Sequence, residues 1–422
     1  MLEISTIREK KDEVIERLKK RNGDFAPAIE QILQIDADRR KTQNELDAQL
    51  AELNKISKEI GALMQSGKKD EANAAKEKTG ELKNTTKILQ DKLAELESQQ
   101  QQLLYTVPNT PNSIVPEGKT PEENLEVFRY GEIPKLVNAL PHWDLCAKYD
   151  LIDFELGVKI TGAGFPVYKN KGARLQRALI NFFLDEAAKA GYIETQAPHM
   201  VNEASGYGTG QLPDKEGQMY HVGIDNLYLI PTAEVPLTNL YRDVILKEEE
   251  LPVKLTGYTP CFRREAGSYG KDVRGLNRLH QFDKVEIVQI EHPDRSYATL
   301  DTMVEHVKGL LIKLGLPFRI LRLCGGDMGF TSALTYDFEV YSTAQERWLE
   351  VSSTSNFETF QANRLKLRFK DGSGKTRLAH TLNGSALALP RIVAGIYENY
   401  QTPEGIKVPE VLVPYTGFDM IN

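Results

Sequence analysis

The pattern of apolar positions is most regular in the first quarter of the chain. Between residues 82 and 103, apolar or small polar residues recur at alternating intervals of four and three, which is the 3.5-residue period of a helix packed along a partner. A second apolar stripe precedes it, so the sequence predicts two long helices that pack together. The two stripes consist of Leu46, Leu50, Leu53, Ile60 and Leu63, and of Leu82, Thr86, Leu89, Leu93, Leu96, Gln100 and Leu103.

A break separates the stripes at Gln65-Ser66-Gly67-Lys68, where glycine favours the end of a helix. We therefore expect an antiparallel helical hairpin over residues 27–104, with helices of about 38 residues that are each roughly 55 Å long. An isolated heptad segment is usually a structural or dimerising coiled coil. Both ends of this hairpin return to one place, however, so its tip near Lys68 and Lys69 projects, and a projecting arm is suited to grasping a ligand.

A proline-rich stretch, Tyr105–Asn124, follows the hairpin and cannot continue the helix. Beyond it, β-branched and aromatic runs alternate with helical patterns, for example a helix at Arg174–Lys189 and a strand at Lys284–Ile290. The expected domains are an N-terminal helical arm at 1–110, a linker at 111–125 and a second domain at 126–422. Periodicity alone does not separate an α+β fold from other mixed folds for the second domain.

Composition limits the classes of protein that fit. The chain has 422 residues, of which 41% are hydrophobic and 27% charged, so it can bury the cores of two or three globular domains. Its formal net charge of −7 argues against a protein that coats nucleic acid nonspecifically, because such proteins usually have a broadly basic surface. Any contact with RNA is therefore expected to be local.

The cysteines and the N-terminus bear on cellular location. Cys146, Cys261 and Cys324 are widely separated and lack the spacing of a zinc site or a disulfide framework. The N-terminal segment mixes acidic and basic residues, and no run approaches the roughly 18 apolar residues of a membrane span. We expect a cytoplasmic protein that is neither exported nor embedded in a membrane.

The segment Thr259–Glu286 carries the strongest chemical signal. Two strand-like runs bracket a loop that is rich in arginine and glycine. Arginine presents a planar fork of donors that fits phosphate oxygens, and glycine lets a backbone fold over a ligand without a clash. A solvated surface hairpin is the alternative, but the composition fits a polyphosphate site. The residues concerned are Arg263, Arg264, Arg274 and Arg278, with Gly267, Gly270 and Gly275.

The order of residues within this segment resembles a known family. Phe262-Arg263-x-Glu265 followed by Arg278-x-His280-Gln281-Phe282 is similar to motif 2 of the class II aminoacyl-tRNA synthetases, in the form of the bacterial seryl-tRNA synthetases. Further stretches resemble the same family in the same order, and the likeness covers essentially the whole chain. These stretches are Ile230–Leu240, Leu323–Phe330, Glu350–Phe357 and His380–Arg391.

The resemblance implies a fold and an assembly. It implies an α+β protein, in which a two-helix coiled-coil arm precedes a catalytic domain with a mostly antiparallel sheet flanked by helices. The stretch Gly191–Pro198 and the helix before it look like motif 1, which shapes a homodimer interface in the family. The arm would hold the long variable arm of serine tRNA through backbone and shape. Lysines near its tip that could contact phosphates are Lys55, Lys58, Lys68, Lys69, Lys76 and Lys78.

The resemblance also implies a reaction. The carboxylate of L-serine would attack the α-phosphate of ATP to give seryl-adenylate, and tRNA(Ser), with tRNA(Sec) as a further acceptor, would then take the seryl group. Mg²⁺ would bridge the phosphates. This chemistry needs no protein nucleophile, because positioning and charge stabilisation supply most of the acceleration.

Residue roles follow from the matched motifs. The catalytic residues would be Arg263, Arg391 and Glu350, with Arg263 on the α-phosphate, Arg391 on the γ-phosphate, and Glu350 and Ser353 as the metal ligands. The full ATP set is Arg263, Arg264, Glu265, Phe282, Glu350, Val351, Ser352, Ser353 and Arg391. The serine set is Thr232, Ala233, Glu234, Arg263, Glu286, Asn383 and Ser385.

Three other interpretations fit the sequence less well. Asp371–Thr376 ends like a phosphate-binding P-loop, but Phe369 stands where its first glycine is required, so a polar turn between strands is expected. A paralogue that loads a carrier protein would be expected to lack the helical arm. A noncatalytic RNA-binding relative would be expected to have lost Arg263, Glu265, Glu350 or Arg391, and all four are present.

Overall fold

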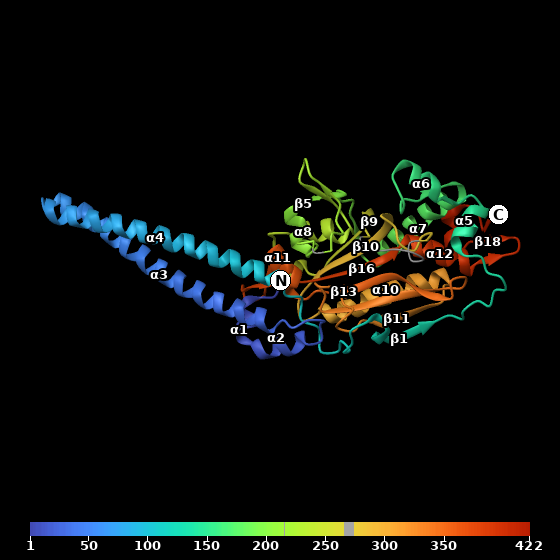
Figure 1. The fold of residues 1–422 in the computed structure, drawn as a ribbon, viewed down its shortest axis with the longest axis horizontal. Helices are drawn as coiled ribbons and strands as arrows, with labels where there is room; N and C mark the ends of the chain where they lie inside the picture. The colour runs from blue at the N-terminus through green and yellow to red at the C-terminus, as the bar shows by residue number, and fades with distance from the viewer. Residues whose placement is uncertain (215, 266–273) are drawn as a thin grey trace. The chain divides into compact units, whose positions relative to one another are not determined.

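A computed structural model describes residues 1–214, 216–265 and 274–422, so Gly267 and Gly270 of the arginine-rich loop lie outside the described residues. The chain divides into two compact units. The first, here called the helical unit, comprises Leu2–Lys19 and Gly23–Pro108. The second, here called the sheet unit, comprises Met1, Lys20–Asn22 and Asn109–Asn422. Figure 1 shows the course of the chain through both.

The helical unit is dominated by a two-helix hairpin (Figure 1). The helices α3 (Ala26–Gln65, 40 residues) and α4 (Lys69–Leu104, 36 residues) pack along each other, and Gly67 lies between them with φ of 76°. The predicted hairpin and its break are therefore confirmed. Two short helices, α1 (Ile4–Glu9) and α2 (Lys11–Leu18), precede it.

The heptad stripe lies in the seam between the two helices. Every predicted stripe position of α4, from Leu82 to Leu103, is at least partly buried, whereas Ile88, outside the stripe, is 66% exposed. Ile56 of α3 is buried and was missed in the predicted stripe, although its spacing from Leu53 and Ile60 fits the period. Glu52 Oε1 and Lys78 Nζ form an ion pair at 2.6 Å, which fixes the facing register of the hairpin.

The sheet unit is built on one eight-stranded sheet. Its strand order is β1-β11-β12-β13-β16-β10-β9-β4, and every neighbouring pair is antiparallel except the edge pair of β4 and β9. The predicted α+β fold with a mostly antiparallel sheet is therefore confirmed. The strands are β1 (Leu125–Tyr130), β4 (Ile193–Glu194), β9 (Val253–Phe262), β10 (Gln281–Glu291), β11 (Phe318–Arg322), β12 (Leu334–Ser342), β13 (Arg347–Asn356) and β16 (His380–Ala388).

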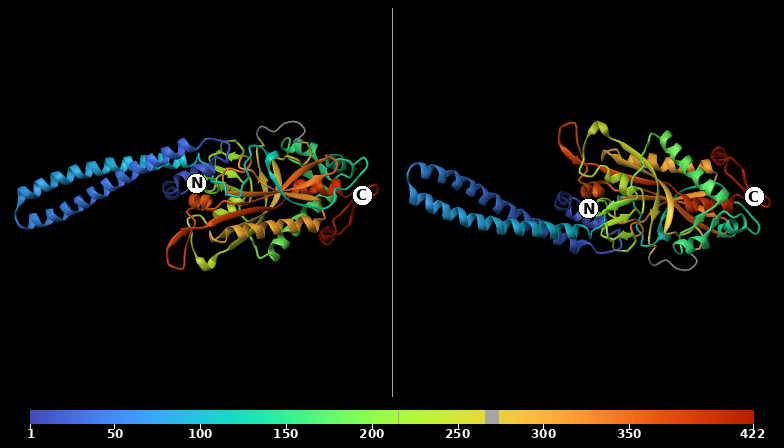
Figure 2. Two further views of the ribbon diagram at one scale, coloured as in Figure 1. Left: turned by 90° about the horizontal axis from the view of Figure 1, so that it is seen from below. Right: turned by 90° about the horizontal axis from the view of Figure 1, so that it is seen from above.

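One face of this sheet is covered by three helices. These are α7 (Asn170–Lys189), α10 (Ser296–Leu314) and α12 (Leu389–Asn399), and Figure 2 shows the same helices and sheet from two further directions. Successive side chains of a strand point to opposite faces, so Val285 and Ile287 of β10 join the helix-covered core while Lys284 and Glu286 point to the other face. This alternation directs the polar residues of the central strands to one surface.

Smaller elements surround the sheet. The polar turn expected at Asp371–Thr376 is confirmed, because it connects two short antiparallel strands, β14 and β15. The other helices are α5 (His142–Lys148), α6 (Phe154–Ile160), α8 (Glu203–Thr209), α9 (Glu234–Asn239), α11 (Thr359–Leu365) and α13 (Val413–Thr416). The other strands are β2 (Ile152–Asp153), β3 (Val167–Tyr168), β5 (Met200–Asn202), β6 (His221–Val222), β7 (Leu227–Leu229), β8 (Ile245–Lys247), β14 (Arg368–Lys370), β15 (Thr376–Leu378), β17 (Gln401–Thr402), β18 (Gly405–Lys407) and β19 (Met420–Ile421).

The helices and the cysteines bear on the expected cellular location. Among the helices of the described residues, none combines the length and the apolar character that a membrane crossing requires. The three cysteines are free and buried.

Candidate active site

A row of polar side chains crosses the face of the sheet opposite α7, α10 and α12, on which α9 and α11 also pack. The strand register sets Glu286 opposite Ser385 and Ser353 opposite Asp337, with Asn383 opposite Ser355 between them. Glu286, Asp337, Asn383 and Ser385 each lie next to a core residue of their own strand. Sheet pairing therefore brings residues up to about a hundred positions apart in the sequence into one surface.

Glu286 is the centre of the first part of this row. Its carboxylate accepts hydrogen bonds from Thr232 Oγ1 and Asn383 Nδ2, both at 3.2 Å, and lies 2.7 Å from Lys284 Nζ. The side chain is only 1% exposed. A buried carboxylate needs such partners, because desolvation penalises an isolated charge. Thr232, Glu286 and Asn383 were predicted to lie together, and the structure brings them together.

Glu234 provides a second buried carboxylate beside the first. It is the first residue of α9, its Oε1 accepts a 2.6 Å hydrogen bond from Gln361 Nε2, and Gln361 in turn accepts one from Thr381 Oγ1. Burial, with the nearby charge of Glu286, raises the pKa of Glu234 to about 7. Two adjacent carboxylates with one lysine leave a site that favours a ligand with a positive charge. Ala233, which was predicted with them, precedes Glu234 and is fully buried.

Arg263 lies at the end of β9, next to this acidic pair. Its backbone N–H donates to His280 O, its guanidinium lies 5.1 Å from the ring centroid of Phe282, and Nε donates to Pro231 O at 3.4 Å. In the described part of the chain, its Nη1 and Nη2 groups have no hydrogen-bond partner. The fork of donors is therefore held by stacking and is available to an anion.

The two residues that follow Arg263 are placed differently. Glu265 adopts a left-handed φ of 48°, and its Oε2 accepts a 3.0 Å hydrogen bond from Arg278 Nη1. The backbone N–H of Arg264 donates to Gln218 O. The hydrogen bond between Arg278 and Glu265 therefore joins the two ends of the arginine-rich loop.

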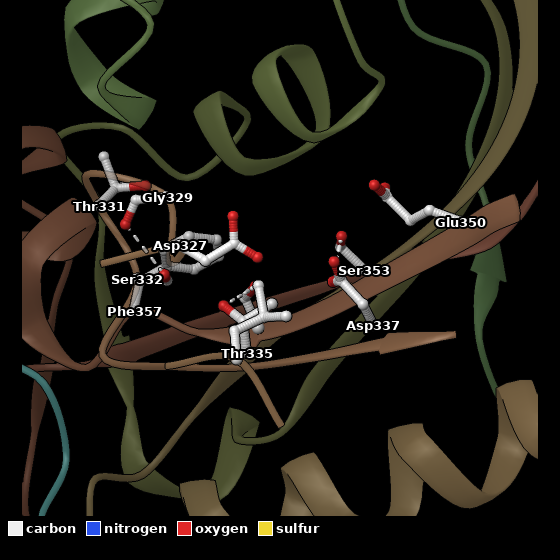
Figure 3. Close-up of a pocket in the computed structure, with 11 residues that line it drawn as sticks. Asp327, Gly329, Thr331, Ser332, Thr335, Asp337, Glu350, Ser353 and Phe357 are labelled. Carbon is white, nitrogen blue, oxygen red and sulfur yellow. Dashed lines mark hydrogen bonds between the residues drawn. The ribbon is translucent and has the colours of Figure 1, made fainter. Parts of the chain in front are cut away.

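A cavity of about 300 Å³ forms the second part of the site (Figure 3). Glu350 and Ser353 line it together with Asp327 and Asp337, and Figure 3 shows Ser353 directly beside Asp337. Ser353 Oγ donates to Asp337 Oδ1 at 2.5 Å. Burial, with the charge of Glu350, raises the pKa of Asp337 well above its usual range. The cavity thus brings the carboxyl groups of Asp327, Asp337 and Glu350 around one space, and burial favours the uncharged form of Asp337.

Arg391 lies at the edge of this cavity. Its Nη1 donates to Glu350 O at 2.7 Å, and its Nε donates to Asn277 O at 3.1 Å. The side chains of Val351 and Ser352 are buried, so a nucleotide could meet these two predicted residues only through their backbone.

Arg21 binds the backbone of one loop that lines the cavity, residues 327–332. The guanidinium of Arg21 donates to the backbone oxygens of Met328, Gly329 and Ser332, and also to Asn109 O. Burial lowers the pKa of Arg21 to about 10, so the residue remains protonated at neutral pH. A charged fork that satisfies four carbonyl groups fixes the cavity wall.

Sequence reasoning missed three residues that belong to this site. Lys284 gave a signal, since a lysine two residues before Glu286 on the same strand shares its face and can neutralise it. Gln361 and Asp337 gave none. Each becomes relevant only through a contact with an element distant in sequence, namely with Glu234 and with Ser353.

Comparison with known proteins places the whole chain among characterised relatives. The family model for the seryl-tRNA synthetase N-terminal domain matches residues 1–111, and that for the class II tRNA synthetase core domain (G, H, P, S and T) matches residues 220–400. Serine–tRNA ligase of Salinibacter ruber is 50% identical over 100% of this chain and 99% of its own length, and that of Thermotoga neapolitana is 48% identical over 100% of both.

Solved structures agree with these matches. Seryl-tRNA synthetase from Pyrococcus horikoshii, complexed with ATP, superposes with a TM-score of 0.92 at 33% identity and covers 100% of this chain and 99% of its own. The cytoplasmic serine–tRNA ligase from Naegleria fowleri, in complex with AMP, superposes with a TM-score of 0.85 at 27% identity over the same shares.

Proposed function

This chain belongs to the seryl-tRNA synthetase family, and we propose that the polar face of its sheet carries out both steps of serine attachment. The activity is the ATP-dependent ligation of serine to tRNA. The observation that carries the proposal is the buried pair Glu234 and Glu286 beside Arg263, whose Nη1 and Nη2 groups have no hydrogen-bond partner among the described residues. This arrangement sets an ammonium site directly next to a phosphate site.

The acidic pair is proposed as the serine pocket. Glu234 and Glu286 would take the ammonium group, while Thr232, Asn383 and Ser385 supply polar partners for the hydroxyl. A buried polar lining rejects an analogue that lacks the hydroxyl, because its groups would then be left unpaired, and such discrimination reaches about 10⁴. Alanine is excluded in this way, whereas threonine must be excluded by size.

The two arginines are proposed as the ATP clamp. Arg263 would hold the α-phosphate, Phe282 and Glu265 the adenine, and Arg391 the γ-phosphate. When the serine carboxylate attacks the α-phosphorus, negative charge accumulates on the phosphoryl oxygens and pyrophosphate leaves. A guanidinium fixed beforehand by stacking stabilises that charge without reorganisation. The seryl group then passes to a terminal ribose hydroxyl of tRNA, and AMP leaves.

Mg²⁺ is proposed to accompany ATP. Glu350 and Ser353 present oxygen donors at the open end of the cavity, and Glu350 is half exposed, which fits a hard cation shared with substrate phosphates. When bound, the ion neutralises phosphate charge and orients the pyrophosphate. Asp337 holds Ser353 Oγ in place for this role.

The helical arm is proposed as the tRNA-grasping element. Lys68 and Lys78 form ion pairs with Glu71 and Glu52. Each lysine can therefore bind a phosphate only if the phosphate replaces its glutamate partner. Lys55, Lys58, Lys69 and Lys76 complete the proposed set, which would hold tRNA(Ser) and, as a further acceptor, tRNA(Sec).

A homodimer is proposed for the active form. The edge strand β4 leaves Ile193 66% exposed, and an apolar residue on an unpaired strand edge is a usual place for a partner. The match of Gly191–Pro198 to motif 1 supports the same edge. Sedimentation velocity should give one species of twice the chain mass, and a monomer at micromolar concentration would contradict the assignment.

The cytoplasm is proposed as the location. All three cysteines are free and buried, which suits a reducing compartment. Fractionation that finds the protein outside the cytoplasm would overturn this.

Attachment of labelled serine to tRNA tests the function. Purified protein, ATP, Mg²⁺ and deproteinised total tRNA should give serine-selective charging, with alanine and threonine as controls. Transcribed tRNA(Ser) and tRNA(Sec), assayed separately, decide the acceptors. Serine-dependent ATP–pyrophosphate exchange without charging of any tRNA would instead favour a ligase that loads a carrier protein.

The raised pKa of Glu234 predicts a pH-dependent serine affinity. Its folded pKa of about 7 lies above the ordinary value of 4.5, so the carboxyl is uncharged at low pH and ionises as pH rises through 7. The ionised form attracts the serine ammonium. The KM for serine should therefore fall about tenfold between pH 6 and pH 8, measured by pyrophosphate exchange.

The variant Glu234→Gln serves as the control, because it removes this titration and leaves the others. Its KM for serine should be high and nearly constant over the same range. Its stability should also lack the pH-dependent contribution of Glu234, whose raised pKa in wild type contributes stability below about pH 4.5 that is lost as pH rises through 7. A wild-type KM profile that the variant reproduces would exclude Glu234 as the group concerned.

A further inference from the structure

A buried network outside the proposed ligand contacts centres on His142 and Glu398. Both side chains are fully buried, His142 at the start of α5 and Glu398 near the end of α12. Glu398 Oε1 accepts from the backbone N–H of His142 at 3.0 Å and lies 2.7 Å from His142 Nδ1. It also accepts from Gln345 Nε2 at 3.1 Å, and Oε2 accepts from Ser342 Oγ.

These partners fix the protonation of both groups. Burial alone would raise the pKa of Glu398, but the hydrogen bonds from His142 and Ser342 outweigh it and lower that pKa, so the carboxylate is ionised. His142 Nε2 accepts a 2.8 Å hydrogen bond from the backbone N–H of Leu276. Because Nε2 is an acceptor, the ring proton resides on Nδ1 and is donated to Glu398.

The other side of the imidazole holds the segment 274–278, which returns from the arginine-rich loop. Arg274 lies 4.6 Å from the ring of Trp143, the residue after His142. Gly275 has φ of 66°, and a Cβ there would lie 2.2 Å from His142 Nε2, so the backbone approaches the imidazole as closely as glycine permits. Asn277 Nδ2 donates to Gln345 Oε1, which ties the segment to Glu398 a second time.

This segment touches the proposed ATP clamp at two points. Asn277 O accepts from Arg391 Nε, and Arg278 Nη1 donates to Glu265 Oε2. Glu398, His142, Leu276, Asn277 and Arg391 thus form one continuous chain of contacts. A neutral histidine whose acceptor nitrogen is oriented by a carboxylate is a rigid support for one backbone N–H.

We propose that His142 is a positioning residue for ATP: oriented by Glu398, it fixes the backbone of 274–278 and so aims Arg391 and the Arg278–Glu265 pair at the nucleotide. The proposal rests on the proposed function of this site. It predicts a defect in ATP binding that spares serine, since Thr232, Glu234, Glu286 and Asn383 of the serine pocket share no hydrogen bond with this network in the described residues.

Two substitutions separate the two sides of the imidazole. His142→Asn keeps a donor near Nδ1 for Glu398 and loses the acceptor for Leu276, whereas His142→Gln places an acceptor near Nε2. Calorimetric titration with ATP and Mg²⁺ should show about tenfold weaker binding for His142→Asn and at most about twofold for His142→Gln. Serine binding should stay within about twofold of wild type in both, and the KM for ATP in pyrophosphate exchange should follow the same order.

If His142 only stabilises the fold, these variants should give different results. If both variants weaken ATP equally, if ATP and serine weaken together, or if only the melting temperature changes, the proposal is wrong. Gln345→Met, at a half-buried position, removes the hydrogen bonds to Asn277 and Glu398 and should weaken ATP binding about threefold; it decides the question if His142→Asn does not fold. Wild type that binds ATP but shows no serine-dependent exchange would overturn the proposed function while leaving these binding differences measurable.

Discussion

Replacing Arg263 by alanine should lower the rate of seryl-adenylate formation about 10³-fold, which corresponds to roughly 4 kcal/mol of transition-state stabilisation. The native contacts of Arg263 are a 3.4 Å hydrogen bond to Pro231 O and stacking on Phe282, both of which are weak. The fold should therefore survive, with a melting temperature within a few degrees of wild type. The measurement is ATP–pyrophosphate exchange in the presence of serine at saturating ATP.

Two companion variants make this result specific. Arg263→Lys keeps the charge and loses the planar fork, so it should recover only a small part of the rate. Arg377→Ala removes an arginine from β15, outside the main sheet, and should leave exchange unchanged. Exchange by Arg263→Ala within tenfold of wild type would mean that another group neutralises the α-phosphate.

The helical arm could be predicted because its signal is local. A 3.5-residue period and one glycine-containing break define the hairpin without any knowledge of distant contacts, and the observed ends at Gln65 and Lys69 match the predicted break. Ile56 was missed, although it lies three residues after Leu53 and four before Ile60 and so fits the same period.

The active face could be predicted only in part, because sheet register is not a local property. The motif residues Thr232, Glu286 and Asn383 were recognised by resemblance, and strand pairing brings them into contact. Gln361 and Asp337 could not be assigned, since their importance depends on contacts with Glu234 and Ser353, which belong to other elements. The support that His142 gives to Leu276 is of the same kind, joining residues 134 positions apart.

Both halves of the site depend on one physical device. Strand alternation sends one set of side chains into the core beneath α7, α10 and α12 and the other set to the opposite face of the sheet. A one-residue slip of β10 would exchange Glu286 for Ile287 and destroy both core and site, so stability and function select the same register. Strand register therefore places the site residues that lie on these strands, whereas Arg263 after β9 and Arg391 on α12 are held by contacts of their own.

Shortening the helical arm should separate the two chemical steps. The pair Glu52–Lys78 shows that residues whose numbers sum to about 130 face each other, so Asn44 and Thr86 can be joined by a short Gly-Ser linker that replaces 45–85. The remaining helices keep their seam at Leu89 and Leu93. Pyrophosphate exchange should stay within about twofold of wild type, while kcat/KM for tRNA charging should fall at least about 100-fold, or about 2.7 kcal/mol.

The salt dependence of tRNA charging, together with a matched variant, tests whether the arm contacts tRNA phosphates. If the arm neutralises phosphates, charging by the full-length chain should weaken steeply with salt, and the shortened chain should lose most of that slope. Glu52→Ala combined with Lys78→Ala removes the ion pair without changing net charge, and it should leave the salt slope nearly intact unless Lys78 itself contacts tRNA. Because the surface of the arm carries both acidic and basic residues, we expect its binding of tRNA to depend on a few lysines that contact the phosphate backbone. Undiminished charging by the shortened chain would therefore return the hairpin to a purely structural role and leave tRNA selection to the sheet unit.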